Sequence, residues 1–181
     1  NSAYTLVVGT AVYPIYYGAV MESAEVSAFL GFISPTAAYT FAIAAAYLCI
    51  SLLAPYLAAL AEVAGNKRSF MRTSVYLGAA ACASLFFFTT NALWLGLLAP
   101  FLASFSFAGS LVFYNSYLPE IAAPEEQDAL SARGFAMGYF GSSFLLIAVL
   151  VAVQNPQWFG AEVTTALITR WSFVLVALWW L

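Results

Sequence analysis

Long stretches of this chain contain no Asp, Glu, Lys or Arg, and this pattern constrains the fold more than any other feature. The stretches cover residues 1–21, 26–61, 73–119, 134–161 and 171–181. Charged residues make up 7% of the sequence and hydrophobic residues 64%, whereas a soluble domain is about one quarter charged. Because so little charge cannot cover a water-facing globule, the main solvent of the chain must be lipid.

Only α-helices and closed β-barrels satisfy every backbone amide inside a bilayer. Barrel strands alternate polar and apolar residues, and runs such as residues 145–151 do not. About 20 apolar residues cross a bilayer as a helix, and the polar turn at residues 89–91 divides the longest charge-free stretch. The sequence therefore predicts an all-α integral membrane protein with six helices. Their expected positions are residues 3–20, 36–60, 71–88, 92–118, 133–153 and 170–181.

The ends of the chain also carry an expectation. The sequence starts at Asn1 without a Met and stops at Leu181 inside an apolar run. The last predicted helix is too short to cross about 30 Å of hydrocarbon. We therefore expect a fragment that is cut at both ends, with a truncated sixth helix.

Basic residues in short loops favour the cytoplasmic side of a membrane. If the N-terminus is cytoplasmic, four basic residues fall inside and only Arg170 falls outside; the four are Lys67, Arg68, Arg72 and Arg133. The reverse orientation gives the opposite count. We therefore expect an integral protein of a bacterial plasma (inner) membrane with a cytoplasmic N-terminus.

Residues that commonly carry catalysis or bind metals are scarce. The chain contains no histidine, which removes His-assisted serine and metal chemistry, and no pair of carboxylates lies within a predicted helix. Cys49 and Cys82 lie deep in apolar runs, so we expect free, buried thiols. The sequence therefore predicts that the protein is not an enzyme and that it has no cofactor, metal site or nucleic-acid partner.

Two charged segments carry the most specific motifs. The loop between the second and third predicted helices reads LAALAEVAGNKR and contains Glu62, Gly65, Lys67 and Arg68. Residues 113–142 read FYNSYLPE at the start and SARGFAMGYFGS at the end. Between these two ends we predict an acidic loop in water. Its charged and helix-breaking residues are Pro124, Glu125, Glu126 and Asp128.

These motifs, with NSAY and PIYY in the first helix, resemble the vacuole effluxer branch of the major facilitator superfamily, a group of secondary transporters. The resemblance implies twelve helices in two halves around a midplane site, each half a pair of inverted three-helix repeats. The six helices here would be the N-terminal half, with the C-terminal half of the same chain as its missing partner. Ala58 stands where the signature loop usually has Gly, and Glu62 where Asp is commoner. The Pro of the exporter signature is missing from the fifth helix, which leaves the direction of transport open.

The resemblance implies that the first and fourth helices line the solute cavity. Polar or small residues recur on the first helix at positions 2, 5, 9, 13 and 16, which is helical spacing. Ordinary helix packing is the alternative, since Ser, Thr and Gly are common at membrane helix contacts. The predicted cavity residues are Thr10, Tyr13, Ser106, Ser110 and Ser143.

Charges at the predicted cytoplasmic helix ends should lie at one depth, and opposite charges there should pair. We expect Glu62 to pair with its basic neighbours, and Glu120 with Arg133, so that the pairs hold this side shut. The alternative is that these are solvated charges that set only the topology. The predicted signature-loop and gate residues are Glu62, Gly65, Lys67, Arg68, Arg72, Asn115, Glu120 and Arg133. The small face expected to pack helices closely consists of Gly134, Gly138 and Gly141.

The function predicted from these features is secondary active transport of a small solute by alternating access. The resemblance implies efflux and associates amino acids with the vacuolar members of the branch. The lipid bilayer and a small-molecule solute are the expected partners. The alternative is a membrane scaffold or assembly subunit that transports nothing.

Overall fold

The computed structural model describes residues 2–23 and 33–181 of the chain, and this part is all-helical. The first helix combines a π-helix η1 (Tyr4–Val12) with α1 (Tyr13–Ser23); we call the two together helix 1. The long helices that follow are α2 (Pro35–Val63), α3 (Lys67–Ser84), α4 (Leu95–Ser116), α6 (Pro124–Gln154) and α7 (Thr165–Trp180). The short connecting elements are η3 (Leu85–Phe87), α5 (Leu118–Ile121) and η4 (Pro156–Phe159).

Five of these helices are long and apolar enough to cross a membrane. The candidate spans are Tyr4–Glu22, Pro35–Val63, Lys67–Phe87, Leu95–Ile121 and Pro124–Gln154. The sixth helix, Thr165–Trp180, is apolar but shorter. The prediction of an all-α membrane protein with six helices is therefore confirmed.

The predicted acidic loop is wrong, because its residues form the first turns of α6, which begins at Pro124 instead of residue 133. Proline fits the first turn of a helix, where its missing N–H has no partner to lose. Glu125 and Glu126 also lie in this turn, where the helix dipole favours negative charge. With 31 residues, α6 is about 46 Å long, so it extends beyond a hydrocarbon core of about 30 Å.

Several basic residues likewise lie in helices and not in loops. Lys67 is the first residue of α3, because the Asn66 side chain caps the helix and accepts a hydrogen bond from the Ser69 N–H at 3.2 Å. Arg170 lies inside α7, where its Nε donates to the carbonyl of Phe86. Its guanidinium lies 4.6 Å from the centre of the Phe86 ring. A charged residue in this chain is therefore not by itself a sign that a helix ends.

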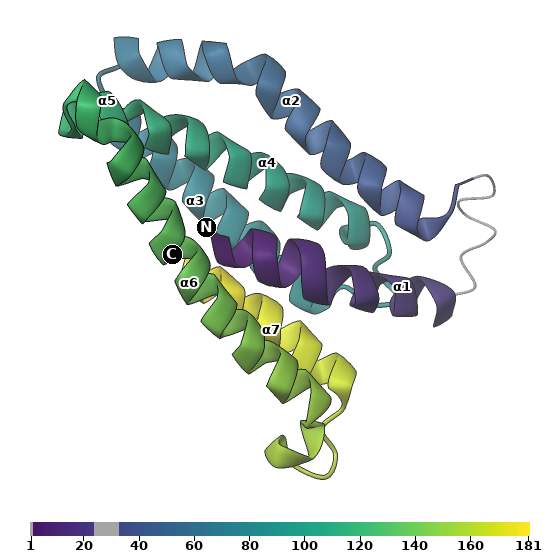
Figure 1. Cartoon of the computed structure of the whole chain (residues 1–181). Helices are drawn as coiled ribbons and strands as arrows, with labels where there is room; N and C mark the ends of the chain where they lie inside the picture. The colour runs from purple at the N-terminus through teal and green to yellow at the C-terminus, as the bar shows by residue number, and fades with distance from the viewer. Residues whose placement is uncertain (1, 24–32) are drawn as a thin grey trace.

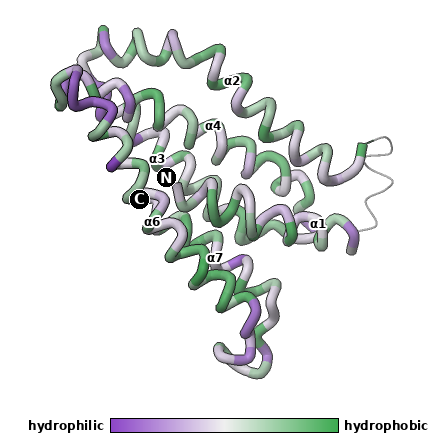
Figure 2. The backbone as a smooth tube through the Cα atoms, viewed as in Figure 1, coloured by the Kyte–Doolittle hydropathy of each residue, from purple (hydrophilic) through white to green (hydrophobic). Residues whose placement is uncertain are grey.

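Helix 1 and α4 form the centre of the bundle, and α2 and α6 form two of its edges (Figure 1). Half of the apolar window of Tyr4–Glu22 and 44% of that of Leu95–Ile121 are buried. The corresponding shares are 11% for α2 and 17% for α6. Figure 2 shows apolar residues along the length of these edge helices and hydrophilic ones near α5. The two edge helices therefore offer most of their surface to lipid or to another protein segment.

Candidate functional site

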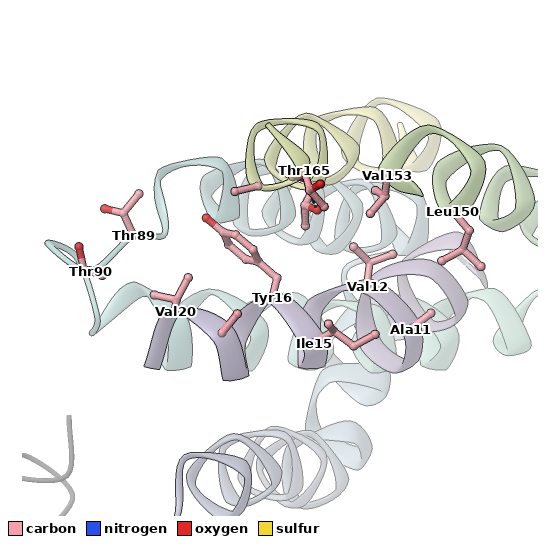
Figure 3. Close-up of a pocket in the computed structure, with 13 residues that line it drawn as sticks. Ala11, Val12, Ile15, Tyr16, Val20, Thr89, Thr90, Leu150, Val153 and Thr165 are labelled. Carbon is pink, nitrogen blue, oxygen red and sulfur yellow. Dashed lines mark hydrogen bonds between the residues drawn. The ribbon is translucent and has the colours of Figure 1, made fainter. Parts of the chain in front are cut away.

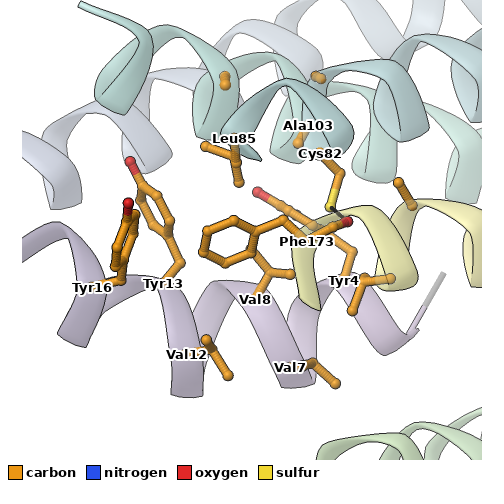
Figure 4. Packing of buried hydrophobic residues seen from close by; sticks show 14 of the residues in the cluster. Tyr4, Val7, Val8, Val12, Tyr13, Tyr16, Cys82, Leu85, Ala103 and Phe173 are labelled. Carbon is orange, nitrogen blue, oxygen red and sulfur yellow. Dashed lines mark hydrogen bonds between the residues drawn. The ribbon is translucent and has the colours of Figure 1, made fainter. Parts of the chain in front are cut away.

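The buried face of helix 1 is tied to α4 through a carbonyl that a proline leaves free. Pro100 lies inside α4 and has no N–H for the carbonyl of Gly96, four residues earlier. Tyr13 donates its hydroxyl hydrogen to that carbonyl. A carbonyl inside a membrane needs such a partner. Tyr13 is fully buried, and its ring packs against Phe88 and Phe173. Figure 4 shows Tyr13 and Phe173 within this cluster.

A second tyrosine donates a hydrogen bond to a carbonyl of helix 1 that a proline leaves free. In a π-helix the carbonyl of Gly9 would accept from the residue five positions later, which is Pro14. Tyr39 of α2 donates its hydroxyl hydrogen to this carbonyl at 3.0 Å. Tyr13 and Tyr39 thus hold helix 1 against α4 and α2 at two places where a proline removes a backbone donor.

A cavity of about 500 Å³ opens beside helix 1, between this helix, α6 and α7 (Figure 3). Aliphatic side chains such as Ile15 and Leu150 make most of its wall, and none of the described residues that line it is charged. Tyr16 also lines it, but its hydroxyl hydrogen is already donated to the carbonyl of Phe88 at 2.9 Å. The remaining hydroxyls on the wall belong to Thr89, Thr90, Thr165 and Thr169. Such a wall can hold a small, uncharged group with a few hydrogen bonds.

The structure separates the five predicted cavity residues into two sets. Thr10 and Ser143 are exposed, whereas Tyr13, Ser106 and Ser110 are buried. The Thr10 hydroxyl donates to the carbonyl of Leu6 at 2.8 Å, and that of Ser110 donates to the carbonyl of Phe107 at 2.7 Å.

Ser143 lies on the cavity side of α6. It precedes Leu150 by two helical turns, so the two residues share one face of the helix. Leu150 lines the cavity together with Ala11 and Ile15 of helix 1. Thr10 and Ser143 are exposed but are not among the residues that line the cavity, and their contact with a solute stays a prediction.

The signature loop forms a tight turn between α2 and α3. Gly65 has a φ of 61°, which a side chain disfavours and glycine tolerates. The Asn66 N–H donates to the carbonyl of Ala61 at 3.2 Å, and the Gly65 N–H to that of Glu62 at 3.0 Å. These two bonds form the Schellman motif that ends many helices. The turn therefore fixes where α3 begins, and with it the position of Lys67.

Lys67 forms an ion pair with Glu120 of α5, with 2.6 Å between Nζ and Oε1. The predicted pairing of Glu120 with Arg133 is wrong. Because α6 begins at Pro124, Arg133 lies about 14 Å further along this helix. Across residues 2–23 and 33–181 the Lys67–Glu120 pair is the one ion pair present. The pair joins the start of α3 to the link between α4 and α6.

A polar cavity of about 400 Å³ surrounds this ion pair. Exposed Glu62 and Arg68 line it without forming an ion pair in the described part of the chain. Arg72 lies one turn further along α3, with its guanidinium 5.7 Å from the centre of the Tyr76 ring. Asn115 is exposed in the last turn of α4. Most of the predicted gate residues therefore gather around this cavity, and within the described part of the chain Lys67 and Glu120 are the two that form an ion pair.

The glycines of α6 lie where other helices come close. A Cβ on Gly138 would lie 2.8 Å from the Ser2 hydroxyl of the segment before η1, and one on Gly134 would lie 2.7 Å from the Tyr114 hydroxyl of α4. A Cβ on Gly141 would lie 3.6 Å from the Trp179 ring of α7. Three partners thus approach this face of α6.

The described residues offer no group of three His, Cys, Asp or Glu side chains that could hold a metal ion. Cys82 is buried and Cys49 half-buried, and both are free thiols. The chemistry available at the cavities is therefore that of hydroxyls, amides, aromatic rings and the charges of the signature loop.

A family model described as "Vacuole effluxer Atg22 like" matches residues 22–181. The chain belongs to this Atg22-like family. It is also 32% identical over 180 residues to the "Uncharacterized MFS-type transporter YxiO" of Bacillus subtilis (strain 168). That match covers 99% of this chain and 41% of the relative, so the chain spans less than half of the length of this transporter. No solved structure matches the chain.

Membership places this Atg22-like chain among major facilitator transporters, which are not enzymes. The family implies an integral membrane protein, a bilayer around it and a solute. The six-helix bundle, with five candidate spans, is consistent with half of a major facilitator fold.

Proposed function

We propose that this chain is the N-terminal half of a secondary active transporter that moves a small solute across a bacterial plasma membrane by alternating access. The observation that carries the proposal is the open cavity of about 500 Å³ beside helix 1, inside a bundle of membrane spans. A second half would cover this side of helix 1 and would meet the exposed faces of α2 and α6. The relative, of which the chain covers 41%, supports the existence of such a half.

The wall of the cavity supports a solute class. Among the described residues it offers hydroxyls and aliphatic side chains and no charge, so the part of the solute that binds this half is uncharged. Amino acids with an apolar side chain fit this description, provided that the second half binds their charged groups. The family description as a vacuole effluxer supports efflux as the type of transport.

Ser143→Cys tests the solute path. In the full-length protein without its native cysteines, a charged methanethiosulfonate should label this position, because it faces a water-filled path, and should abolish amino-acid exchange in proteoliposomes. Ala148→Cys is the matched control on α6. Ala148 lines a groove with Trp171 and Leu175 of α7, so lipid should protect it and transport should continue. Equal labelling at both positions would refute the path; labelling without amino-acid transport would refute only the solute class.

The proposed orientation places the N-terminus and the signature loop in the cytoplasm, following the count of basic residues. Thr90 and Asn66 are both exposed and belong to turns at opposite ends of α3. In a cysteine-free background, Thr90→Cys should react with an impermeant thiol reagent added outside intact cells, and Asn66→Cys should react only after the cells are opened. Labelling of Asn66→Cys from outside would reverse the orientation.

A further inference from the structure

A second groove, of about 350 Å³, lies between α2, α3 and α4. These helices run side by side, with α4 in contact with the other two (Figure 1). Leu57 of α2, Phe70 of α3 and Phe105 of α4 belong to its apolar wall. The exposed side chains of Leu53 and Leu77 also line it, so the groove opens on the surface of the bundle. No residue of helix 1 lines it, so it is separate from the proposed solute cavity.

One buried polar atom of this groove has no hydrogen-bond partner among the described residues. Ser106 of α4 lines the groove, is only 1% exposed, and its hydroxyl makes no hydrogen bond. The other buried serines are satisfied; Ser142, for example, donates to the carbonyl of Gly138 at 2.6 Å. A buried hydroxyl without a partner costs free energy, and lipid chains offer it no acceptor. An occupant with an oxygen acceptor would remove this cost.

The depth and lining of the groove indicate the charge of the occupant. The wall residues of α3 run from Ser69 to Leu77, which is about 12 Å along the helix, so the groove reaches from one end of the span into the hydrocarbon. No charged residue lines it. The hydroxyl of Thr73 is already donated to the carbonyl of Ser69 at 3.0 Å. A volume of about 350 Å³, apolar walls and few polar groups are typical of ligand sites.

We propose that this groove binds a neutral, lipid-soluble carbonyl compound that enters from the bilayer and accepts a hydrogen bond from Ser106. The aromatic side chains of Phe70, Phe105 and Phe113 give the site a preference for a ring beside the carbonyl group. Gly109 leaves room in the α4 backbone here, since a Cβ on it would lie 3.5 Å from the Ser74 hydroxyl. The site is independent of the proposed transport path.

Benzophenone is a suitable probe, because it is neutral and lipid-soluble, carries one carbonyl, and crosslinks to nearby C–H bonds on illumination. With the full-length protein in nanodiscs, we expect saturable crosslinks to Leu53, Leu57 and Leu77, mapped by mass spectrometry. Diphenylmethane, which has the same rings without the carbonyl, should compete poorly. Crosslinking that does not saturate, or that maps elsewhere on the bundle, would overturn the proposal.

Two variants, with one control, test the role of the Ser106 hydroxyl and the location of the site. Ser106→Ala should raise the benzophenone concentration for half-maximal crosslinking by about fivefold, as expected for one lost hydrogen bond. Ser142→Ala, at a buried serine whose hydroxyl is satisfied within α6, should leave it unchanged. Ser74→Phe fills the groove and should abolish the mapped crosslinks. If Ser106→Ala behaves as the wild type, or if Ser142→Ala weakens crosslinking equally, Ser106 does not recognise the carbonyl. Because the readout is crosslinking, its failure leaves the proposed transport function untouched.

Discussion

Gly78→Ala should lower the stability of the protein by about 1–3 kcal/mol, the usual cost of adding a methylene to a packed interior. Gly78 lies on α3 where this helix meets α4 and α7. An added Cβ would lie 2.5 Å from the Trp180 ring and 3.1 Å from Cβ of Ser106. Trp180 is itself buried and stacks on Tyr4 with 5.1 Å between ring centres, so it has no free space to move into. The melting temperature of the purified protein in detergent, followed by fluorescence, measures the effect.

Gly18→Ala is the matched control and should change stability in the opposite direction. Gly18 lies in α1, and a Cβ there meets no atom of the described residues within 4 Å. Alanine favours a helix by up to about 1 kcal/mol over glycine, so this variant should be equally or more stable. A smaller ring in the double variant Gly78→Ala, Trp180→Phe should recover part of the loss. If Gly78→Ala melts at or above the temperature of Gly18→Ala, α3 and α7 do not pack as closely as described.

The helices could be predicted from the sequence because lipid leaves few alternatives for long apolar runs. The ends of the helices could not be predicted in this way, because charged residues occur inside helices as well as in loops. Glu125 and Glu126 belong to the first turn of α6, where the helix dipole stabilises them. Arg170 lies inside α7, and its guanidinium finds a partner in η3. The outcome was decided by the helix dipole in the first case and by a tertiary contact in the second.

The position of Tyr13 shows what periodicity alone misses. Its place in a polar stripe predicted contact with a solute, but the structure uses its hydroxyl for the carbonyl of Gly96. A signal was present, since Pro100 within a predicted span leaves one carbonyl without a donor. The sequence does not show which hydroxyl reaches that carbonyl, because this depends on how helix 1 packs on α4. The groove at Ser106 was missed for the same reason, as α2, α3 and α4 each contribute to it.

Reversing either charge of the Lys67–Glu120 pair should slow transport several-fold, and reversing both should restore most of it. We propose that this pair closes the signature-loop end of the half by joining α3 to α5. Lys67→Glu or Glu120→Lys places like charges where 2.6 Å now separates opposite ones. The fold should tolerate Lys67→Glu, because the first residue of a helix favours negative charge.

The double variant Lys67→Glu, Glu120→Lys shows whether transport depends on the direct attraction between these two residues or only on the charge at each position. It restores the attraction, although Glu62 still acts on position 67, so the rescue should be incomplete. Arg133→Glu is the control, since Arg133 is exposed on α6 and forms no ion pair with any described residue; it should transport as the wild type. Exchange in proteoliposomes gives the rates, and labelling of Asn115→Cys reports opening at this end, which the single reversals should increase. A double variant no better than the single ones would leave the pair with no part in closure, because only a direct interaction between the two charges is restored by exchanging them.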